Sequence, residues 1–357
     1  MLEFSQLLKQ AVTEGAADIF IISGLGLSLK VGGEIRVCDK DMLLPDDTMR
    51  IIKEAYILAG RDPVKLIETG DDDFSVAVKG LSRFRISAYK QRGSWAAVIR
   101  VIPFDIPNYK EFNISEDVMA ISTRTKGLVL VTGPAGGGKS TTLACVIDRI
   151  NKERNCHIIT LEEPIEFLHR NTKSVISQRE VRSDTEGYVP ALRAALRQSP
   201  DVILVGEMRD YETISTAMTA AETGHLVIST LHSVGAANTV SRIIDVFPSN
   251  QQQQVRVQLS QILQSVVSQK LLPAKDGRLI PAFEIMHCNN AIRNMIRENK
   301  VHQIDTVINA SAASDGMVGM DNSILTLLKS GVITKETALG FAETPELVER
   351  RLALIEK

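Results

Sequence analysis

The sequence predicts an α/β protein in which a small α+β domain precedes a doubly wound, mostly parallel sheet. From residue 113 onward, helical and strand-like patterns alternate, as they do in parallel sheets with helical crossovers. A glycine-rich loop lies between an apolar run and a helical pattern within residues 127–147. The length of 357 residues leaves room for two domains.

The composition is that of an ordinary globular protein. Charged residues make up 24% and hydrophobic residues 44%, and the net charge of -2 gives no support for bulk nucleic-acid binding. The four cysteines form no CxxC pair, so neither a disulfide framework nor a zinc site is indicated. The sequence has no signal-peptide pattern and no apolar run long enough to span a bilayer. We therefore expect a cytoplasmic protein that reaches a membrane only through partners.

Residues 1–105 are predicted to form the first domain. The first 15 residues have an amphipathic helix pattern, and Gly32-Gly33 is typical of a turn between two strands. A second helix is expected at Asp46–Ala59. Strands are expected at residues 18–22, 27–31, 34–37, 73–78, 82–91 and 94–102.

A segment with two prolines and little periodicity, Pro103–Asn108, indicates the domain boundary. We place the linker at residues 106–112 and the second domain at residues 113–357. After about residue 280 the pattern is mainly helical, with periodic segments near residues 291–299, 303–310, 321–329 and 334–342. Strands of the second domain are expected at residues 127–132, 156–161, 173–178, 201–206 and 225–230.

The loop after the first of these strands carries the pattern G-x-x-x-x-G-K-[ST], which is typical of phosphate-binding loops. Backbone N–H groups and the positive end of the following helix would surround the phosphates. Lys139 is expected to reach the β- and γ-phosphates of ATP, and the Ser140 hydroxyl to bind Mg²⁺. The predicted nucleotide-binding residues are Gly133, Pro134, Ala135, Gly136, Gly137, Gly138, Lys139, Ser140 and Thr141.

Acidic residues follow two of the predicted strands, at the edge where the phosphates would lie. Hydrolysis needs a group that orients or deprotonates water, and a carboxylate can do this. Glu207 follows a clean apolar run, which favours a catalytic role over that of a helix cap. For Glu162 the pattern alone leaves both roles open.

Two histidines bracket the strand predicted at residues 225–230. His232 follows the strand and fits a γ-phosphate contact and a structural cap equally well. For His225, at the start of the strand, we favour the structural role.

Three segments after the phosphate loop resemble motifs of the secretion ATPase superfamily, in that family's order. Glu162–Phe167 resembles its Asp box, Pro200–Asp210 its Walker B segment, and Gly224–Ser233 its His box. The chain most resembles the PilT family of type IV pilus retraction ATPases, within the PilT/GspE-like group. Ala291–Glu298 matches that family's AIRNLIRE helix with one Leu-to-Met change, and further matches are Ser177–Val181, Ala191–Arg197 and Gly316–Asn322.

The resemblance covers nearly the whole chain and is densest at residues 113–345. It implies a PAS-like N-terminal domain, a RecA-like P-loop ATPase domain and a helical C-terminal extension. It also implies a homohexamer that binds ATP between neighbouring subunits and retracts type IV pili in twitching motility. The implied partner is a PilC-like polytopic platform protein of the inner membrane. The resemblance implies that the chain itself neither binds nucleic acid nor inserts directly into the membrane.

Site roles follow from the same resemblance. Glu162 would be the catalytic glutamate, Glu207 would act with Mg²⁺ and water, and Glu163 would be a further candidate for the metal. His225 and His232 would both line the site. Arginines of the N-terminal domain contact phosphate in the family, and the matching strands make Arg85 and Arg100 the candidates, because a guanidinium can neutralise charge on the γ-phosphate.

The chain departs from the family pattern at several positions. Glu163 stands where an Asp is usual, and Ala135 and Gly137 replace the usual Thr and Ser of the phosphate loop. Since backbone donors hold the phosphates, we expect ATP binding to survive. The segment Ala16–Ile21 lacks the family's serine and histidine, which leaves the contacts of the N-terminal domain open.

Several alternatives remain at this point. One is an accessory retraction motor or a secretion motor of the same fold. The extension ATPases carry an extra N-terminal domain and a four-cysteine zinc module, and the missing CxxC pairs favour the retraction class. Another is a regulatory module that binds ATP with little turnover. The one feature of the sequence that suggests it is Glu163, which replaces the usual Asp. A RecA-like nucleic-acid motor is disfavoured by the net charge and by an aromatic content of 4%.

Overall fold

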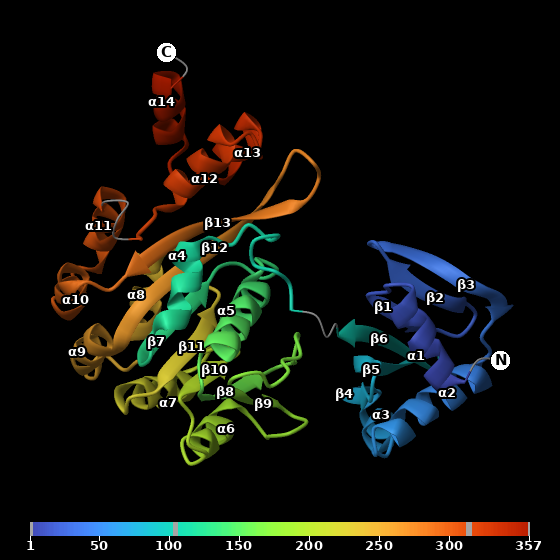
Figure 1. The fold of residues 1–357 in the computed structure, drawn as a ribbon. Coiled ribbons are helices and arrows are strands. Elements are labelled where there is room, and N and C mark those ends of the chain that lie inside the picture. Colours follow the sequence, from blue (N-terminus) through green and yellow to red (C-terminus); the bar gives the residue numbers. More distant parts are fainter. Residues whose placement is uncertain (1–2, 103–105, 312–315, 356–357) are drawn as a thin grey trace. The chain divides into compact units, whose positions relative to one another are not determined.

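A computed structural model describes residues 3–102, 106–311 and 316–355 (Figure 1). The chain divides into two compact units, one over Met1–Asp105 and one over Ile106–Ile165 and His169–Lys357. Residues 103–105 of the expected boundary segment lie outside the described residues, as do the first two residues of the expected N-terminal helix.

The first unit is a six-stranded antiparallel sheet with helices packed on it (Figure 1). The strand order is β3-β2-β1-β6-β5-β4. Helix α1 (Phe4–Thr13) buries Phe4, Leu7 and Leu8, whose spacing places them on one helical face. The strands are β1 (Asp18–Ile21), β2 (Gly26–Val31), β3 (Glu34–Met42), β4 (Asp71–Val78), β5 (Ser82–Gln91) and β6 (Ser94–Ile102).

All six strands of the first unit are therefore as the sequence predicted, and so is helix α2 (Pro45–Leu58). The short helix α3 (Val64–Thr69) was not predicted. It has fewer than two turns, so no hydrophobic period can develop, and Gly70 ends it in the left-handed conformation at φ 87°.

The second unit contains a seven-stranded sheet in the order β13-β12-β7-β11-β10-β8-β9. Its five predicted strands are confirmed, and all of them run parallel. Strands β7, β10 and β11 are buried along their whole length, which explains their unbroken runs of apolar residues. The strands are β7 (Gly127–Thr132), β8 (His157–Glu162), β9 (Val175–Glu180), β10 (Val202–Val205) and β11 (Leu226–Leu231).

Helices cover both faces of this sheet. One core joins Val129 and Val131 of β7 to helix α5 (Lys139–Glu153) and to the short helices α4 (Glu116–Met119) and η1 (Ala120–Thr123). A second core joins Leu128 and Leu130, which point to the opposite face, to six other α-helices. These are α6 (Tyr188–Ala195), α7 (Tyr211–Glu222), α8 (Ala236–Asp245), α9 (Gln252–Ile262), α10 (Asn290–Arg297) and α11 (Ile304–Ala310).

The sequence did not predict the hairpin of β12 (Leu263–Pro273) and β13 (Leu279–His287). Strand β12 pairs parallel with β7, and β13 runs antiparallel to β12 (Figure 1). Helix α9 ends at Ile262 and β12 begins at the next residue. Because no turn residue separates the two elements, the change from helical to strand period has no boundary signal.

The predicted helical segments near the C-terminus are confirmed. Asn289 caps α10 and Thr334 caps α13 by accepting hydrogen bonds from backbone N–H groups of the first turn. Both carboxylate oxygens of Asp321 accept backbone N–H groups, from Glu343 and Thr344. The helices are α10 (Asn290–Arg297), α11 (Ile304–Ala310), α12 (Met320–Lys329), α13 (Lys335–Phe341) and α14 (Pro345–Ile355).

Candidate functional site

The predicted phosphate loop connects the end of β7 to the start of α5. Gly138 is the N-cap residue of α5 and has φ 81°, and Gly133 and Gly136 have φ 140° and 71°. Such positive φ values are accessible to glycine at little cost. A Cβ on Gly133 would lie 2.1 Å from the Gln269 carbonyl oxygen, so no other residue fits there. The loop therefore has the open, glycine-lined backbone that a phosphate group needs.

Lys139 and Ser140 lie on the first turn of α5, beside this loop. The Lys139 ammonium donates to the carbonyl oxygens of Gly133 and Pro134, both at 2.8 Å, so the buried side chain folds back along the loop. Ser140 is exposed and Thr141 is half-buried. The residue types, the backbone conformation and the helix N-terminus together fit a nucleotide's phosphates.

Glu162 is the last residue of β8, at the same edge of the sheet. Its Oε1 accepts hydrogen bonds from Thr160 Oγ1 at 2.6 Å and from Gln178 Nε2 at 3.2 Å. Both donors come from strands, β8 and β9, so the carboxylate is held on rigid backbone. A fixed carboxylate of this kind is suited to orient a water molecule.

Glu163 follows in the loop and has a different partner. Its Oε1 lies 2.8 Å from Arg182 Nε in an ion pair, and the Arg182 side chain is 81% exposed. An exposed ion pair of this kind contributes little to stability and is exchangeable. The metal role expected for Glu163 stays a prediction.

Glu207 lies just beyond β10 and is joined by two side chains. Its Oε2 is 2.7 Å from Arg209 Nε and 3.4 Å from His232 Nε2. His232 directly follows β11, the neighbour of β10 in the sheet. The structure thus brings Glu207 and His232 together, as both were expected to lie at the site.

Within this chain, His225 lies away from Glu207 and His232. His225 precedes β11, and its carbonyl accepts the backbone N–H of Gly127, where β7 begins. A six-residue strand separates the two histidines, which places them about 20 Å apart at opposite edges of the sheet. His225 Nδ1 instead lies 3.0 Å from the Ala220 carbonyl, at the end of α7. This is the structural role that we favour for His225.

Arg85 and Arg100 lie in the first unit, directly opposite each other on β5 and β6. Arg85 approaches Asp73 at 4.0 Å, and Arg100 Nε donates to Asp18 at 2.9 Å. The Arg100 side chain is 65% exposed. The two arginines are therefore cross-strand neighbours on a single sheet.

Tyr188 was missed by the sequence reasoning. Its hydroxyl oxygen lies 2.9 Å from the position of a Cβ on Gly206, next to the Leu161 carbonyl and the Glu162 backbone. A side chain at position 206 would therefore displace the phenol from its place between the ends of β8 and β10. Burial raises the pKa of Tyr188, and the carboxylates of Glu207, Glu163 and Glu162 raise it further, so the phenol stays a hydrogen-bond donor. A single tyrosine at the start of a short helix gives no sequence signal for this position.

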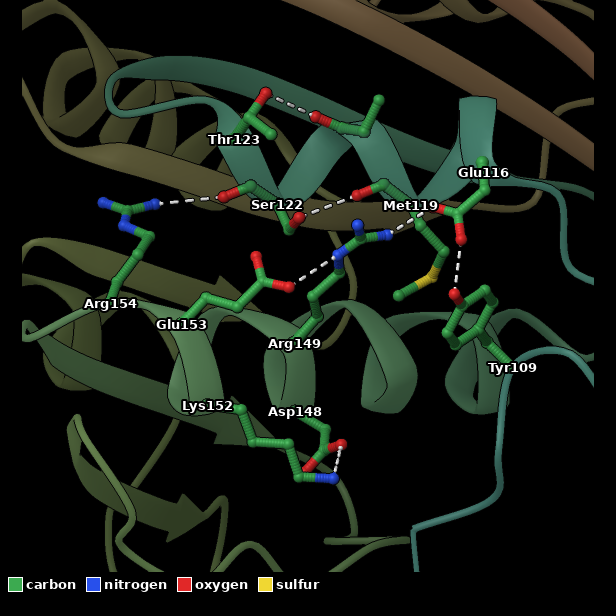
Figure 2. Close-up of polar contacts among 11 residues, drawn as sticks. Tyr109, Glu116, Met119, Ser122, Thr123, Asp148, Arg149, Lys152, Glu153 and Arg154 are labelled. Atoms are coloured by element: carbon green, nitrogen blue, oxygen red, sulfur yellow. Dashed lines mark hydrogen bonds and ion pairs between the residues drawn. The ribbon is translucent and has the colours of Figure 1, made fainter.

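The far end of α5 carries a separate polar network, shown in Figure 2. Arg149 bonds Glu116 at 2.6 Å and Glu153 at 3.1 Å, and the Tyr109 hydroxyl also donates to Glu116. A cavity of about 400 Å³ lies there, between α5 and residues 106–109. Its lining shares no residue with the phosphate loop, so it is not part of the candidate site.

Comparison with known families decides the identity. The family described as "Type II/IV secretion system protein" matches residues 2–316. The chain belongs to this family. It is 42% identical to the Pseudomonas aeruginosa "Type IV pilus retractation ATPase PilT", over 97% of this chain and 99% of that protein. It is 48% identical to a Neisseria gonorrhoeae "Twitching motility protein", over 77% of this chain and 73% of that protein.

A solved structure of a family member has the same fold. "Crystal Structure of the Pilus Retraction Motor PilT and Bound ADP" matches with a TM-score of 0.90 and 44% identity, over 98% of this chain and 100% of that chain. The predicted family and fold class are thus confirmed: an N-terminal α+β domain, a RecA-like ATPase domain and a helical C-terminal region.

Among the described residues, no three His, Cys, Asp or Glu side chains are grouped so that they could hold a metal ion. No helix in the described part of the chain has the length and apolar character needed to cross a bilayer.

Proposed function

We propose that the chain is an ATPase motor that works as a homohexamer and drives the retraction of type IV pili. The observation that carries this proposal is the placement of Glu162, Glu207 and His232 at the same sheet edge as the phosphate loop. The likeness to the Pseudomonas PilT protein over almost the full length of both chains supports the retraction role.

In this proposal the loop backbone and Lys139 bind the phosphates of ATP. Ser140, Glu207 and Glu163 would hold Mg²⁺, which would neutralise charge on the phosphates of ATP. Since Mg²⁺ keeps several water ligands and binds through phosphates, it needs no cluster of three carboxylates. Glu162 orients the attacking water and accepts its proton, and His232 senses the γ-phosphate.

Arg85 and Arg100 complete the site from the first unit in the assembled ring. Arg85 is held by Asp73 in an exposed ion pair, which is worth about 0–1 kcal/mol and can exchange for a phosphate at little cost. The partner of Arg100, Asp18, has a buried carboxylate, so release of Arg100 costs more. The guanidinium groups would then neutralise charge that develops during hydrolysis.

The work is delivered to a PilC-like platform protein of the inner membrane, so the motor is cytoplasmic and membrane-associated only through that partner. Helix α10 is the candidate coupling element. Arg293 donates to the carbonyl oxygens of Ser260 and Gln261 and thus caps α9, so a variant there would disturb the fold. Arg297 is exposed, and its guanidinium donates to Asn294 of the same helix. It is the residue with which to test coupling.

Two measurements test the proposal. The purified protein should hydrolyse ATP with a Mg²⁺ requirement, and Lys139→Ala should reduce turnover by about 100-fold or more. Arg297→Glu should leave ATPase activity intact and abolish pilus retraction, observed with labelled pilin in living cells. Wild-type turnover no higher than that of Lys139→Ala would favour a regulatory ATP-binding module instead. Normal retraction with Arg297→Glu would remove α10 from the coupling path.

A further inference from the structure

Strand β12 carries a buried glutamine that lies against the phosphate loop. The Gln269 side chain is on the face of the sheet that α5 covers, and the residue is only 2% exposed. Its Oε1 accepts a hydrogen bond of 2.7 Å from Thr142 Oγ1, on the first turn of α5. A buried polar pair of this kind is costly to break, because both groups would lose their partner away from water.

The same residue contacts both ends of the loop. The Gln269 carbonyl oxygen fills the space where a Cβ of Gly133 would be, at 2.1 Å, and its Nε2 lies 2.7 Å from the Cβ position of Gly138. The first and last glycines of the motif are thus packed on one residue of a distant strand. The conformation of the loop depends on where β12 places Gln269.

The neighbouring residue on β12, Ser268, is bonded to a second loop on the opposite face of the sheet. Ser268 Oγ accepts the backbone N–H of Gly235 at 2.9 Å. Glu284, directly opposite Ser268 on β13, accepts the next N–H, that of Ala236, at 2.7 Å. These two N–H groups begin α8 and end the loop that starts at His232. Residues 232–235 are called the His232 loop below.

We propose that Gln269 and Ser268 are positioning residues that fix the phosphate loop and the His232 loop relative to each other. The proposal rests on the ATPase function and assigns this chain's hairpin a role in its site. Gln269 holds the loop that binds the nucleotide, so it governs affinity. Ser268 holds the loop that carries the γ-phosphate contact, so it governs turnover.

The hairpin also carries the C-terminal helices. The backbone N–H of Phe283, on β13, donates to Ser323 Oγ of α12, and Ile285 pairs with Val318 just before that helix. Lys270, next to Gln269, approaches Glu343 at 3.4 Å. A displacement of the C-terminal helices would therefore reach both loops through adjacent residues of one strand.

Fluorescent mant-ADP binding and steady-state ATP turnover test the two assignments separately. Gln269→Leu and Thr142→Val each remove the buried bond from one side, and we expect each to raise the dissociation constant of mant-ADP about tenfold. Their turnover at saturating ATP should stay within about twofold of wild type. The variant with both changes should bind mant-ADP no more weakly than the weaker-binding single variant, since the same hydrogen bond is lost in all three. Ser268→Ala should lower turnover about tenfold and leave mant-ADP affinity within about twofold.

Gln264→Leu is the matched control, because Gln264 is a glutamine of the same strand at its other end, bonded to the Ile262 carbonyl. It should change neither quantity. Unchanged mant-ADP affinity in both Gln269→Leu and Thr142→Val would overturn the proposal. So would equal losses of affinity and turnover in Gln269→Leu and Ser268→Ala, since that is the result of a general loss of structure. Because mant-ADP binding needs no hydrolysis, a wild type without turnover would contradict the ATPase function and leave the affinity result for Gln269 valid.

Discussion

The two edges of the parallel sheet carry similar residues and use them differently. At the carboxyl edge, where the strands end, Glu207 bonds the side chains of Arg209 and His232. At the amino edge, where they begin, His157 bonds the Gln198 carbonyl and Ser177, and His225 bonds the Ala220 carbonyl. Polar groups at the amino edge thus bond to neighbouring elements and stabilise the fold. At the carboxyl edge, the two partners of Glu207 are exposed, so a ligand can replace them.

The largest expected effect is at the carboxyl edge. Glu207→Gln and Glu162→Gln should each lower ATP turnover by about 10²–10⁴-fold, because a neutral amide can neither accept a proton nor bind Mg²⁺ as a carboxylate does. Turnover of the purified variants measures this. Asp201→Asn is the control, since this acid at the amino edge bonds the His157 N–H at 2.8 Å. A loss of turnover in Asp201→Asn comparable to that in Glu207→Gln would erase the distinction between the edges.

A second prediction concerns Glu284, which supports the start of α8 behind the His232 loop. The pKa of Glu284 is raised to about 7, mainly because the carboxyl group is buried. The charges of Glu343 and Asp305 also raise this pKa, whereas the hydrogen bond from the Ala236 N–H and the charge of Lys270 lower it. Because the pKa is raised in the folded state, the stabilising contribution is complete below about pH 4.5 and is lost as the pH rises through about 7. The loss amounts to at most about 3 kcal/mol of the free energy of unfolding.

Urea denaturation between pH 5 and pH 8 measures this loss. Glu284→Gln should flatten the pH dependence and be more stable than wild type at pH 8. A slope that is the same in the variant and the wild type would assign the pH dependence to other groups.

A third prediction compares histidines at the two edges. His157→Ala should lower the free energy of unfolding by about 2 kcal/mol, because two hydrogen bonds are lost, and leave turnover within about twofold. His232→Ala should do the reverse, with turnover reduced about tenfold and stability little changed. Turnover and urea denaturation of both variants provide the test. If the two variants lost the same property, the edges would not differ in role.

The smallest effect is expected for His225. His225→Ala should cost about 1 kcal/mol of stability, from the bonds to Ala220 and Thr223, with ATP turnover unchanged. A turnover loss as large as that of His232→Ala would show that His225 acts in a site, and since His225 is far from the phosphate loop of its own chain, that site would belong to a neighbouring subunit.

Much of this fold could be predicted because its signals are local. The strands β7, β10 and β11 are buried on both faces and read as unbroken apolar runs, and the glycine loop is contiguous in the sequence. The β12–β13 hairpin could not be predicted in this way, because β12 follows α9 without a turn residue. The same holds for Tyr188 and Gln269, single residues whose roles arise from contacts with Gly206 and Thr142 far along the chain.

The sequence by itself determined the nucleotide loop, the strands around it, the family and the acidic residues that come after two strands. Only the tertiary structure decided which of these residues meet. His225 and His232 bracket the same strand, and the family resemblance implied that both line the site, yet the strand between them places them at opposite edges of the sheet. A parallel sheet gathers the residues after its strands at one edge and the residues before its strands at the other. The chemistry of the site therefore depends on strand direction and register, which are properties of the folded sheet.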